Sequence, residues 1–286
     1  MGEKTGKQKA EAHQFGSHGA KGDSVRMLAA RPEPIRVDVS HTAVLVVDMQ
    51  NDFAAKGGMF DRARIDISGI RKAILPIAQV LGCARAVGMP IVYVKAGYLP
   101  DLSDLGAPGS PNRERHLLYG VGQTIETPDG AEGRILIRDT WNTDVIPELE
   151  PQPRDVRIYK HRYSAFYETE LDRVLKQLRV TSLIFVGCTT SVCLESTLRD
   201  AFFRDYSCIL LTDCTAEPIG LQAAGYKVGQ DTARASPAGG TNYQATLLLT
   251  QMIFGWVSDS EAFTKTFVTE GVSTTERVST TVSSTA

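Results

Sequence analysis

The chain has 286 residues, of which 42% are hydrophobic and 22% are charged, a composition typical of a globular protein with a sizeable core. Its 31 basic and 33 acidic side chains give a formal net charge of -2. The only basic stretch is the short amino terminus, which argues against a nucleic-acid partner. No apolar run approaches the roughly 20 residues that a membrane span needs, and the start lacks the apolar core of a secretory signal. We therefore expect a cytoplasmic protein that binds neither nucleic acid nor membrane.

The first residues carry almost no apolar periodicity. Residues 1–30 are rich in Gly, Lys, Ala and His, which predicts a disordered extension. Met27 is a second candidate for the start of translation, because a recognisable pattern begins only at residue 31. Residues 264–286 are dominated by Thr, Ser and Val, which predicts a flexible tail. We expect one domain over residues 31–263.

Strand and helix patterns alternate through that domain. Apolar runs rich in β-branched residues predict strands buried on both faces at 43–47, 90–94, 156–159, 183–186, 207–211 and 253–257. Apolar residues at helical spacing predict helices at 68–87, 168–178, 191–203 and 245–252. This alternation predicts an α/β fold with a doubly wound, mostly parallel six-stranded sheet and helices on both faces.

Two long connections interrupt the alternation. Residues 98–142 are rich in Gly and Pro, which predicts a loop with one helical turn near 113–118, and residues 220–240 predict a second loop. Loops of this length in a compact α/β domain are often functional lids or oligomer contacts. Both loops are therefore candidates for covering a site.

Three residues with chemical potential follow predicted strands. Asp48 follows the first strand, Lys160 closes the third, and Cys193 lies where the fourth strand turns into a helix. Each has a plainer interpretation alone: a turn-capping carboxylate, a lysine facing solvent, and a buried inert cysteine. In a parallel sheet, however, all three emerge at one edge, which is where such folds bind ligands.

These three residues together are suited to acyl transfer. A thiol is mostly protonated at neutral pH, although a helix start stabilises its thiolate, so a neighbouring carboxylate can take the proton as sulfur attacks a carbonyl. Asp48 is the expected base, and Lys160 is expected to hold that carboxylate and help orient the carbonyl. The backbone N–H groups of Thr189 and Cys193 are the expected oxyanion donors, and Cys188 belongs to the turn that shapes that hole.

The same residues resemble the isochorismatase-like cysteine hydrolases, which share a Rossmann-like three-layer sandwich. The resemblance spans residues 31–263 and rests on residues 46–53 (Val-Val-Asp-Met-Gln-Asn-Asp-Phe), Lys160, and residues 187–197 (Gly-Cys-Thr-Thr-Ser-Val-Cys-Leu-Glu-Ser-Thr). It implies a catalytic triad of Asp48, Lys160 and Cys193, a cis peptide bond before Thr189, and the oxyanion hole described above. It also implies a homo-oligomer, commonly a dimer or a tetramer.

Finer similarity indicates the type of substrate. The ureidoacrylate amidohydrolases of pyrimidine catabolism are similar at residues 57–58, 109–112, 151–153, 162–166, 193–200 and 254–259, and biuret hydrolases at 100–105 and 133–136. Both groups cleave an amide next to a ureido group through a cysteine-bound intermediate, with no cofactor. The resemblance therefore implies an amidohydrolase for a small linear ureido compound, with biuret, triuret or N-carbamoyl amino acids as alternative substrates.

Two other interpretations stay open. One is an isochorismatase-type vinyl-ether hydrolase, which needs no cysteine nucleophile, and the other is a catalytically silent scaffold subunit. An intact set of Asp48, Lys160 and Cys193 argues against both.

The residues around the expected pocket are less well specified. The ureidoacrylate enzymes carry amide side chains and a tryptophan where this chain has Lys95, Ala96 and Tyr98, so Lys95 is a candidate cation for a substrate carboxylate. Phe53, Tyr98 and Tyr163 are candidates for the pocket wall, with ordinary core packing as the alternative.

We expect no catalytic metal. The nicotinamidase branch binds zinc through a histidine pair after the second strand, and that segment of this chain has no histidine. The five histidines are not at ligand spacing, and each is expected to lie at the surface or cap an element. They are His13, His18, His41, His116 and His161. The cysteines match no zinc-ligand spacing either, so free thiols are expected.

Overall fold

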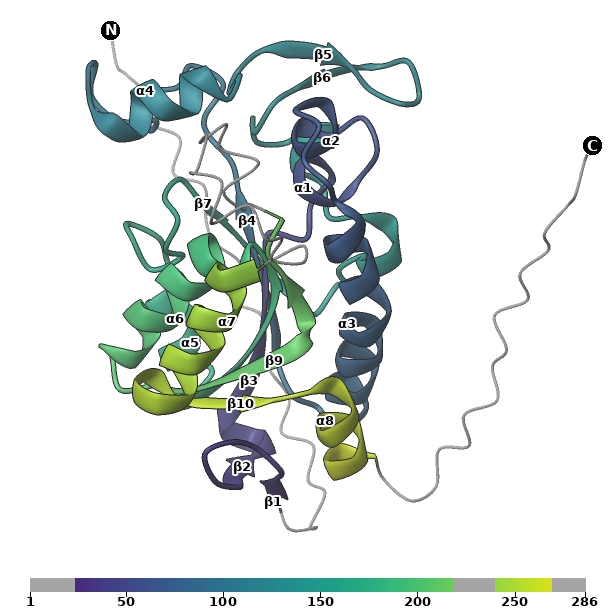
Figure 1. Cartoon of the computed structure of the whole chain (residues 1–286), viewed down its shortest axis with the longest axis vertical. Coiled ribbons are helices and arrows are strands. Elements are labelled where there is room, and N and C mark those ends of the chain that lie inside the picture. The colour runs from purple at the N-terminus through teal and green to yellow at the C-terminus, as the bar shows by residue number, and fades with distance from the viewer. Residues whose placement is uncertain (1–23, 219–239, 269–286) are drawn as a thin grey trace, which may run out of the picture.

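The computed structural model describes residues 24–218 and 240–268. Its main sheet has six parallel strands in the order β10-β9-β8-β3-β4-β7, which confirms the predicted fold class (Figure 1). The strands are β3 (Thr42–Val47), β4 (Ile91–Ala96), β7 (Val156–Lys160), β8 (Ser182–Cys188), β9 (Ser207–Ala216) and β10 (Trp256–Ser258). The strand order reverses between β3 and β8, and such a reversal is where open α/β sheets bind ligands.

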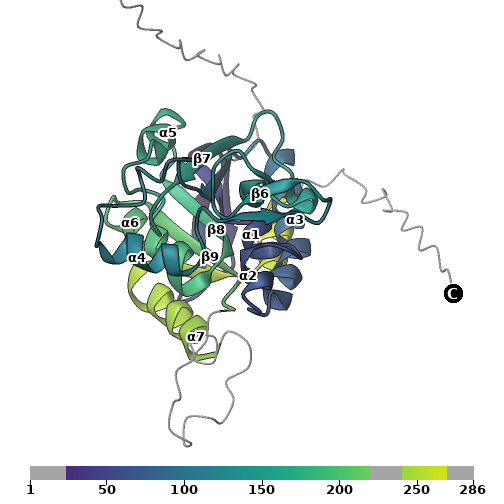
Figure 2. The ribbon, with the colours of Figure 1, turned by 90° about the horizontal axis from the view of Figure 1, so that it is seen from above.

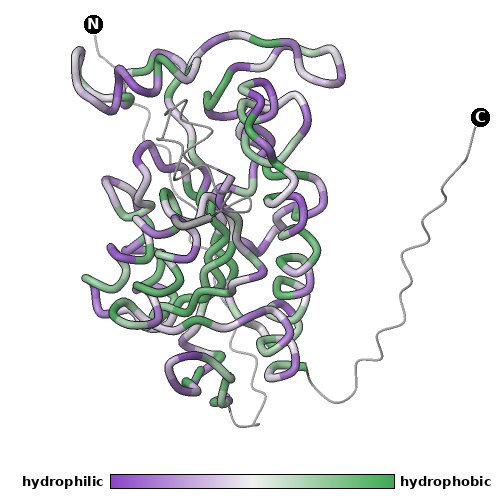
Figure 3. The backbone as a smooth tube through the Cα atoms, in the orientation of Figure 1, coloured by the Kyte–Doolittle hydropathy of each residue, from purple (hydrophilic) through white to green (hydrophobic). Residues whose placement is uncertain are grey.

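Helices cover both faces of this sheet. Helices α3 (Ser68–Ala86) and α8 (Ser260–Phe267) lie on one face, and α5 (Leu171–Gln177), α6 (Glu195–Phe202) and α7 (Gly240–Leu249) lie on the other (Figures 1 and 2). Every residue of β3 is buried, and alternate side chains point to opposite layers. Val44 and Val46 pack in the core under α3, whereas Ala43, Leu45 and Val47 pack in the core under α5 and α6. The hydrophobic segments accordingly concentrate in the central strands (Figure 3).

The carboxyl ends of the strands carry further elements. Short helices α1 (Asn51–Ala54) and α2 (Met59–Arg62), helix α4 (Pro111–Leu118), and the hairpin of β5 (Thr124–Glu126) and β6 (Glu132–Arg134) all lie at this end of the sheet (Figure 1). Residues 98–142 were expected to be a loop with one helical turn, so the turn is confirmed as α4 and the hairpin is an addition. The expected second loop, 220–240, lies outside the described residues except for Gly240, which begins α7.

One glycine fixes how closely β3 and β8 approach at that end. Gly187 has φ +118°, and a Cβ atom there would lie 2.0 Å from the carbonyl oxygen of Val47. Only glycine fits this combination of backbone angle and contact. The chain can therefore leave β8 directly beside the residue that follows β3.

The domain extends beyond both expected boundaries. Strand β1 (Val25–Leu28) pairs with β2 (Ile35–Asp38), so the prediction of disorder through residue 30 is wrong for this hairpin. Leu28 is fully buried, which explains why the hairpin is held. The tail predicted from residue 264 is likewise wrong at its start, because α8 continues to Phe267, which packs against Phe263.

The last strand also begins later than expected. The apolar run at 253–257 predicts one strand, but its first two residues complete a π-helical turn, Thr250–Phe254, and β10 begins at Trp256. Within the described residues, no helix is both long and apolar enough to cross a membrane.

Candidate active site

Asp48 and Lys160 form a buried ion pair at the carboxyl edge of the sheet. Oδ2 of Asp48 lies 2.9 Å from Nζ of Lys160, and each side chain is 1% exposed. Oδ1 accepts a hydrogen bond of 2.9 Å from the N–H of Ala96, so Oδ2 is the oxygen that faces the cation. Nζ also donates to the carbonyl of Arg162 at 3.2 Å. Asp48 has φ 53°, a left-handed conformation that Asp tolerates better than most residues.

Lys160 stays positively charged in this setting. Burial favours the neutral amine and is the largest single influence, but the interactions with Asp48 and Cys193 together outweigh it, so the pKa of Lys160 rises above its ordinary value. A fixed cation at the end of β7 can therefore hold the Asp48 carboxylate and stabilise negative charge formed next to it.

Cys193 lies in the π-helical turn Thr190–Leu194 that joins β8 to α6, and it is 8% exposed. Burial and the neighbouring Asp48 carboxylate raise the pKa of its thiol well above the ordinary value, and Lys160 only partly opposes this. The expected stabilisation of the thiolate by a helix start is thus outweighed by desolvation. The thiol of Cys193 is therefore protonated at neutral pH and lies beside a carboxylate that can accept its proton.

The turn that carries Cys193 is tied to the rest of the edge. The peptide bond between Cys188 and Thr189 is cis, as the family resemblance implies. The thiol of Cys188 donates to the carbonyl of Asp48 at 3.3 Å, which links the turn to the other half of the site. The hydroxyl of Thr197 donates to the carbonyl of Cys193 at 2.7 Å and accepts from the N–H of Ala165 at 3.1 Å.

Two further residues that hold the turn were not singled out from the sequence. Thr215 lies near the end of β9 and Glu217 directly follows that strand. The hydroxyls of Thr190 and Thr215 are 2.8 Å apart, and Glu217 accepts from the N–H of Ser191 at 2.7 Å. The predicted strand stopped at residue 211, so neither residue was placed at the sheet edge. Polar residues after an apolar strand were the signal that could have found them.

A cluster of three aromatic rings, those of Tyr98, His116 and Tyr163, lies beside the site. The ring of His116, on α4, lies 5.5 Å from that of Tyr98 and 5.6 Å from that of Tyr163. Burial raises the pKa of Tyr163, and Cys193 is the next largest influence on it, so this partly exposed tyrosine lies near Cys193. The expectation that each histidine lies at the surface or caps an element is wrong for His116, which is 7% exposed.

The other two candidate pocket residues contact different elements. Nζ of Lys95 donates to the hydroxyl of Tyr159 at 3.0 Å and lies 4.4 Å from the centroid of that ring. Because side chains alternate along β4, Lys95 shares the face of Tyr93, opposite to the face on which Val94 and Cys193 pack. The ring of Phe53 packs against Phe60 at 4.8 Å in the core beside α3. The structure thus places Tyr98 near Lys160 and Tyr163 near Cys193, whereas Lys95 and Phe53 contact other residues.

No group of three or more His, Cys, Asp or Glu side chains is arranged to hold a metal ion anywhere in residues 24–218 and 240–268.

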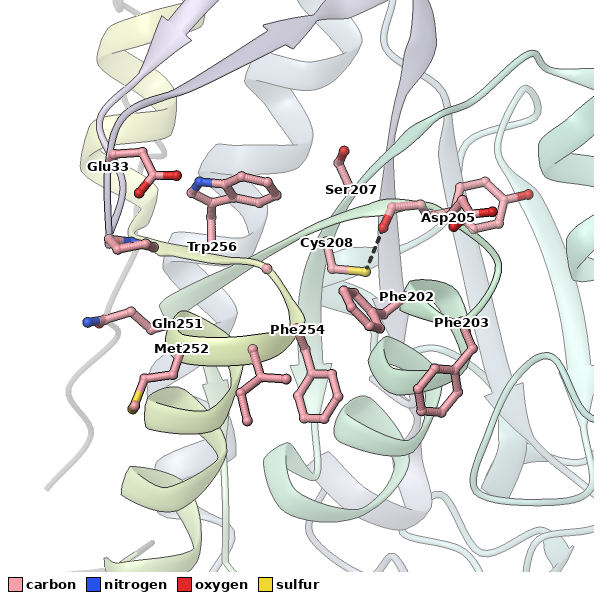
Figure 4. A pocket seen from close by; sticks show the side chains of 14 residues that line it. Glu33, Phe202, Phe203, Asp205, Ser207, Cys208, Gln251, Met252, Phe254 and Trp256 are labelled. Carbon is pink, nitrogen blue, oxygen red and sulfur yellow. Dashed lines mark hydrogen bonds between the residues drawn. The ribbon is translucent and has the colours of Figure 1, made fainter.

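A surface groove lies at the other end of the strands. It is bordered by Phe202 and Phe203 at the end of α6, by Cys208 near the start of β9, and by Met252 and Trp256 (Figure 4). Because Asp48, Lys160 and Cys193 lie at or after the carboxyl ends of their strands, this groove is remote from all three. A second, polar groove contains Arg162, whose carbonyl accepts from Lys160, and therefore borders the site.

Comparison with known proteins agrees with this geometry. The sequence profile of the isochorismatase domain matches residues 42–222. The chain belongs to the isochorismatase family. Ureidoacrylate amidohydrolase RutB of Caulobacter segnis is 39% identical over 241 residues, covering 84% of this chain and 92% of that protein. The protein of the same name from Agrobacterium fabrum is 38% identical over 236 residues, covering 82% and 94%.

Two solved structures share the fold. A cysteine hydrolase from Pseudomonas syringae pv. phaseolicola 1448A superposes with a TM-score of 0.63 at 29% identity, covering 80% of this chain and 93% of that one. N-carbamoylsarcosine amidase from Thermoplasma acidophilum superposes with a TM-score of 0.52 at 25% identity, covering 77% and 96%. These comparisons support a hydrolase.

Proposed function

We propose that this isochorismatase-family hydrolase is a cysteine-dependent amidohydrolase that cleaves a C–N bond of a small linear ureido compound. The observation that carries the proposal is the buried Asp48–Lys160 pair at 2.9 Å, whose carboxylate and ammonium both act on the thiol of Cys193. A protonated thiol needs a base at the moment of attack, and the carboxylate beside it meets that need without a cofactor.

Acylation proceeds at the carbonyl carbon of the substrate. Asp48 takes the thiol proton as the sulfur of Cys193 forms a bond to carbon, and the carbonyl π electrons move to oxygen. The backbone N–H groups of Thr189 and Cys193 are the proposed donors to this oxyanion. The C–N bond then breaks, and protonated Asp48 gives its proton to the departing nitrogen. The product of this step is a thioester on Cys193 and a free amine or ammonia.

Deacylation uses the same carboxylate. Asp48 takes a proton from water, the water oxygen attacks the thioester carbon, and the C–S bond breaks with return of the proton to sulfur. Lys160 keeps its charge throughout, because its raised pKa holds it protonated, and it keeps Asp48 in place in both half-reactions.

The substrate class comes from the relatives. Proteins named ureidoacrylate amidohydrolase share 38–39% identity over more than four-fifths of the chain, which favours a ureidoacrylate-type substrate. The similarity to N-carbamoylsarcosine amidase favours N-carbamoyl amino acids as the second candidate. Both substrates present a carbonyl flanked by nitrogen, so the same attack applies to each.

An ammonia-release screen tests the proposal. The panel contains ureidoacrylate, biuret, triuret, N-carbamoyl amino acids and nicotinamide, assayed with the wild type and with Cys193→Ser. We expect turnover of a ureido compound by the wild type only, with a Cys193 thioester detected by mass spectrometry. Wild-type turnover by Cys193→Ser, or a response to nicotinamide alone, would contradict it.

A separate assay addresses the vinyl-ether alternative. Incubation with isochorismate is expected to yield no dihydroxybenzoate product. Formation of that product by both the wild type and Cys193→Ser would replace the amidohydrolase with a hydrolase that does not use the thiol.

A further inference from the structure

The end of β9 supplies two buried polar side chains that take no part in the proposed chemistry. Thr215 and Glu217 are 6% and 3% exposed. One carboxylate oxygen of Glu217 lies 2.7 Å from the N–H of Ser191 and also accepts the hydroxyl of Ser191. The hydroxyls of Thr215 and Thr190 are 2.8 Å apart. Two consecutive residues of the turn that precedes Cys193 are therefore fixed to a different strand.

Some backbone N–H groups of this turn already donate hydrogen bonds within the protein, and the others are the proposed oxyanion donors. The N–H groups of Val192 and Leu194 both donate to the carbonyl of Thr189 at 3.2 Å, and the N–H of Ser191 donates to Glu217. An oxyanion must be bound by N–H groups that are not already committed, and those of Thr189 and Cys193 are the proposed ones. Glu217 removes Ser191 from the available set and fixes the tilt of its peptide plane.

We infer that Glu217 is a positioning residue that holds the 189–193 turn so that its oxyanion donors face the carbonyl attacked by Cys193. An ionised carboxylate only accepts hydrogen bonds, so it can take both the N–H and the hydroxyl of Ser191 without a competing donor. The inference rests on the proposed function, because it assigns Glu217 to the oxyanion step of that reaction. Thr215 is a second and weaker tie to the same turn.

Two reactions of Cys193 distinguish a positioning role of Glu217 from a general disturbance of the folded site. Hydrolysis forms an oxyanion, whereas alkylation by iodoacetamide joins sulfur to a saturated carbon, expels iodide and forms no oxyanion. For Glu217→Ala we expect kcat to fall about 100-fold, since displaced oxyanion donors cost that much or more. We expect the rate of Cys193 alkylation and KM to change by less than about threefold.

A conservative variant and a control variant test whether the loss of kcat comes from the hydrogen bonds of Glu217. Glu217→Gln keeps an acceptor for the N–H of Ser191 and is expected to recover kcat to within about tenfold of the wild type. Asp213→Asn is the control, because Asp213 lies on the same strand but accepts from the N–H of Ser260 at 2.9 Å, at the start of α8. That variant is expected to keep wild-type kcat. A parallel loss of kcat, alkylation rate and thermal stability in Glu217→Ala, or an unchanged kcat, would overturn the inference.

A measurement that needs no turnover tests the role of Glu217 independently of the proposed amidohydrolase activity. Propionaldehyde adds to the thiol: a C–S bond forms, the C=O π electrons move to oxygen, and the thiol proton ends on that oxygen. The adduct places its oxygen in the proposed hole and protects Cys193 from iodoacetamide. Protection by propionaldehyde is expected to need about tenfold more aldehyde in Glu217→Ala, and equal protection in both proteins would overturn the role of Glu217. Failure of the wild type to hydrolyse any amide would instead refute the proposed function.

Discussion

Nζ of Lys160 lies 2.9 Å from Oδ2 of Asp48, and water reaches neither side chain to a significant extent. Removing one member of such a pair leaves the other buried without its counter-charge, which typically costs about 3–5 kcal/mol of stability. We therefore expect Asp48→Asn and Lys160→Met each to lower the free energy of unfolding substantially. The double variant is expected to be less destabilised than the sum of the two single variants, because no lone charge remains.

Denaturant unfolding of the four proteins measures this coupling. Lys265→Met is the control, since Lys265 pairs with Glu261 at 2.5 Å on the exposed face of α8 and should change the unfolding free energy little. Strict additivity of the Asp48 and Lys160 variants would show that the pair is not coupled in solution.

The thiol of Cys193 offers a second prediction. Burial raises the pKa of this thiol most, the negative charge of Asp48 raises it further, and the positive charge of Lys160 lowers it. Asp48→Asn removes the effect of Asp48 and leaves that of Lys160, so we expect the pKa of the thiol to fall while amide hydrolysis is lost with the base. Ultraviolet absorbance of the thiolate, titrated against pH and corrected with Cys193→Ser, measures the change. An unchanged or higher pKa in Asp48→Asn would mean that the carboxylate does not act on the thiol.

His116 gives a prediction about acidic pH. Its Nδ1 lies 2.7 Å from the carbonyl of Asn112, which can only accept, so Nδ1 carries the proton. Burial, together with the charges of Lys160 and Arg162, lowers the pKa of His116 below 6.5, which keeps the ring neutral at neutral pH. As the pH falls below that range, protonation places a third cation near the site, and we expect kcat/KM to fall.

A substitution that preserves packing isolates this titration. His116→Phe keeps an aromatic ring between Tyr98 and Tyr163 but cannot be protonated, so its pH profile is expected to lack that part of the acid limb. His41→Phe is the control, since His41 pairs with Asp38 near the first strands, and it should retain the wild-type profile. Identical acid limbs in the wild type and His116→Phe would exclude His116 as the titrating group.

The proximity of Asp48, Lys160 and Cys193 could be predicted because its signal is local in the sequence. Asp48 directly follows its strand, Lys160 ends its strand, and Cys193 lies in the turn after its strand, and parallel strands bring such ends to one edge. Lys95 shows where this reasoning stops. It pairs in register with Tyr159, whereas Ala96 pairs with Lys160. That difference of one residue directs Lys95 to the other face of the sheet, and strand register is not readable from a single sequence.

The residues that were missed depend on tertiary contacts. The environment of His116 is created by Tyr98 and Tyr163, which lie 18 and 47 positions away along the chain. Thr215 and Glu217 contact the turn that carries Cys193. They lie at or just after the end of β9, which extends beyond the apolar run that predicted the strand. The hairpin of β1 and β2 is short, and it is stabilised by the burial of Leu28. No pattern within these residues alone indicates that burial.

Asp52 leads to a prediction about stability and pH. Its buried carboxylate accepts from the N–H groups of Met59 at 3.0 Å and Leu136 at 2.7 Å and from the side chain of Asn142 at 2.6 Å, which joins α1 to the segment after the hairpin. These donors lower its pKa, but burial outweighs them and raises it from 3.8 to about 6. The folded state thus binds a proton more tightly than the unfolded state, so the contribution of Asp52 to stability is complete at low pH and falls as the pH rises toward 6.

The difference in pKa sets the size of the effect. It corresponds to about 3 kcal/mol of unfolding free energy lost between pH 4 and 6. Other carboxylates titrate in the same range, so the quantity to measure is the difference in unfolding free energy between the wild type and Asp52→Asn at each pH. Because Asn cannot ionise, this difference is expected to shift in favour of the variant as the pH rises through that range. A difference that stays constant from pH 4 to 7 would mean that Asp52 has the same pKa in the folded and unfolded chains, and that the three donors offset its burial completely.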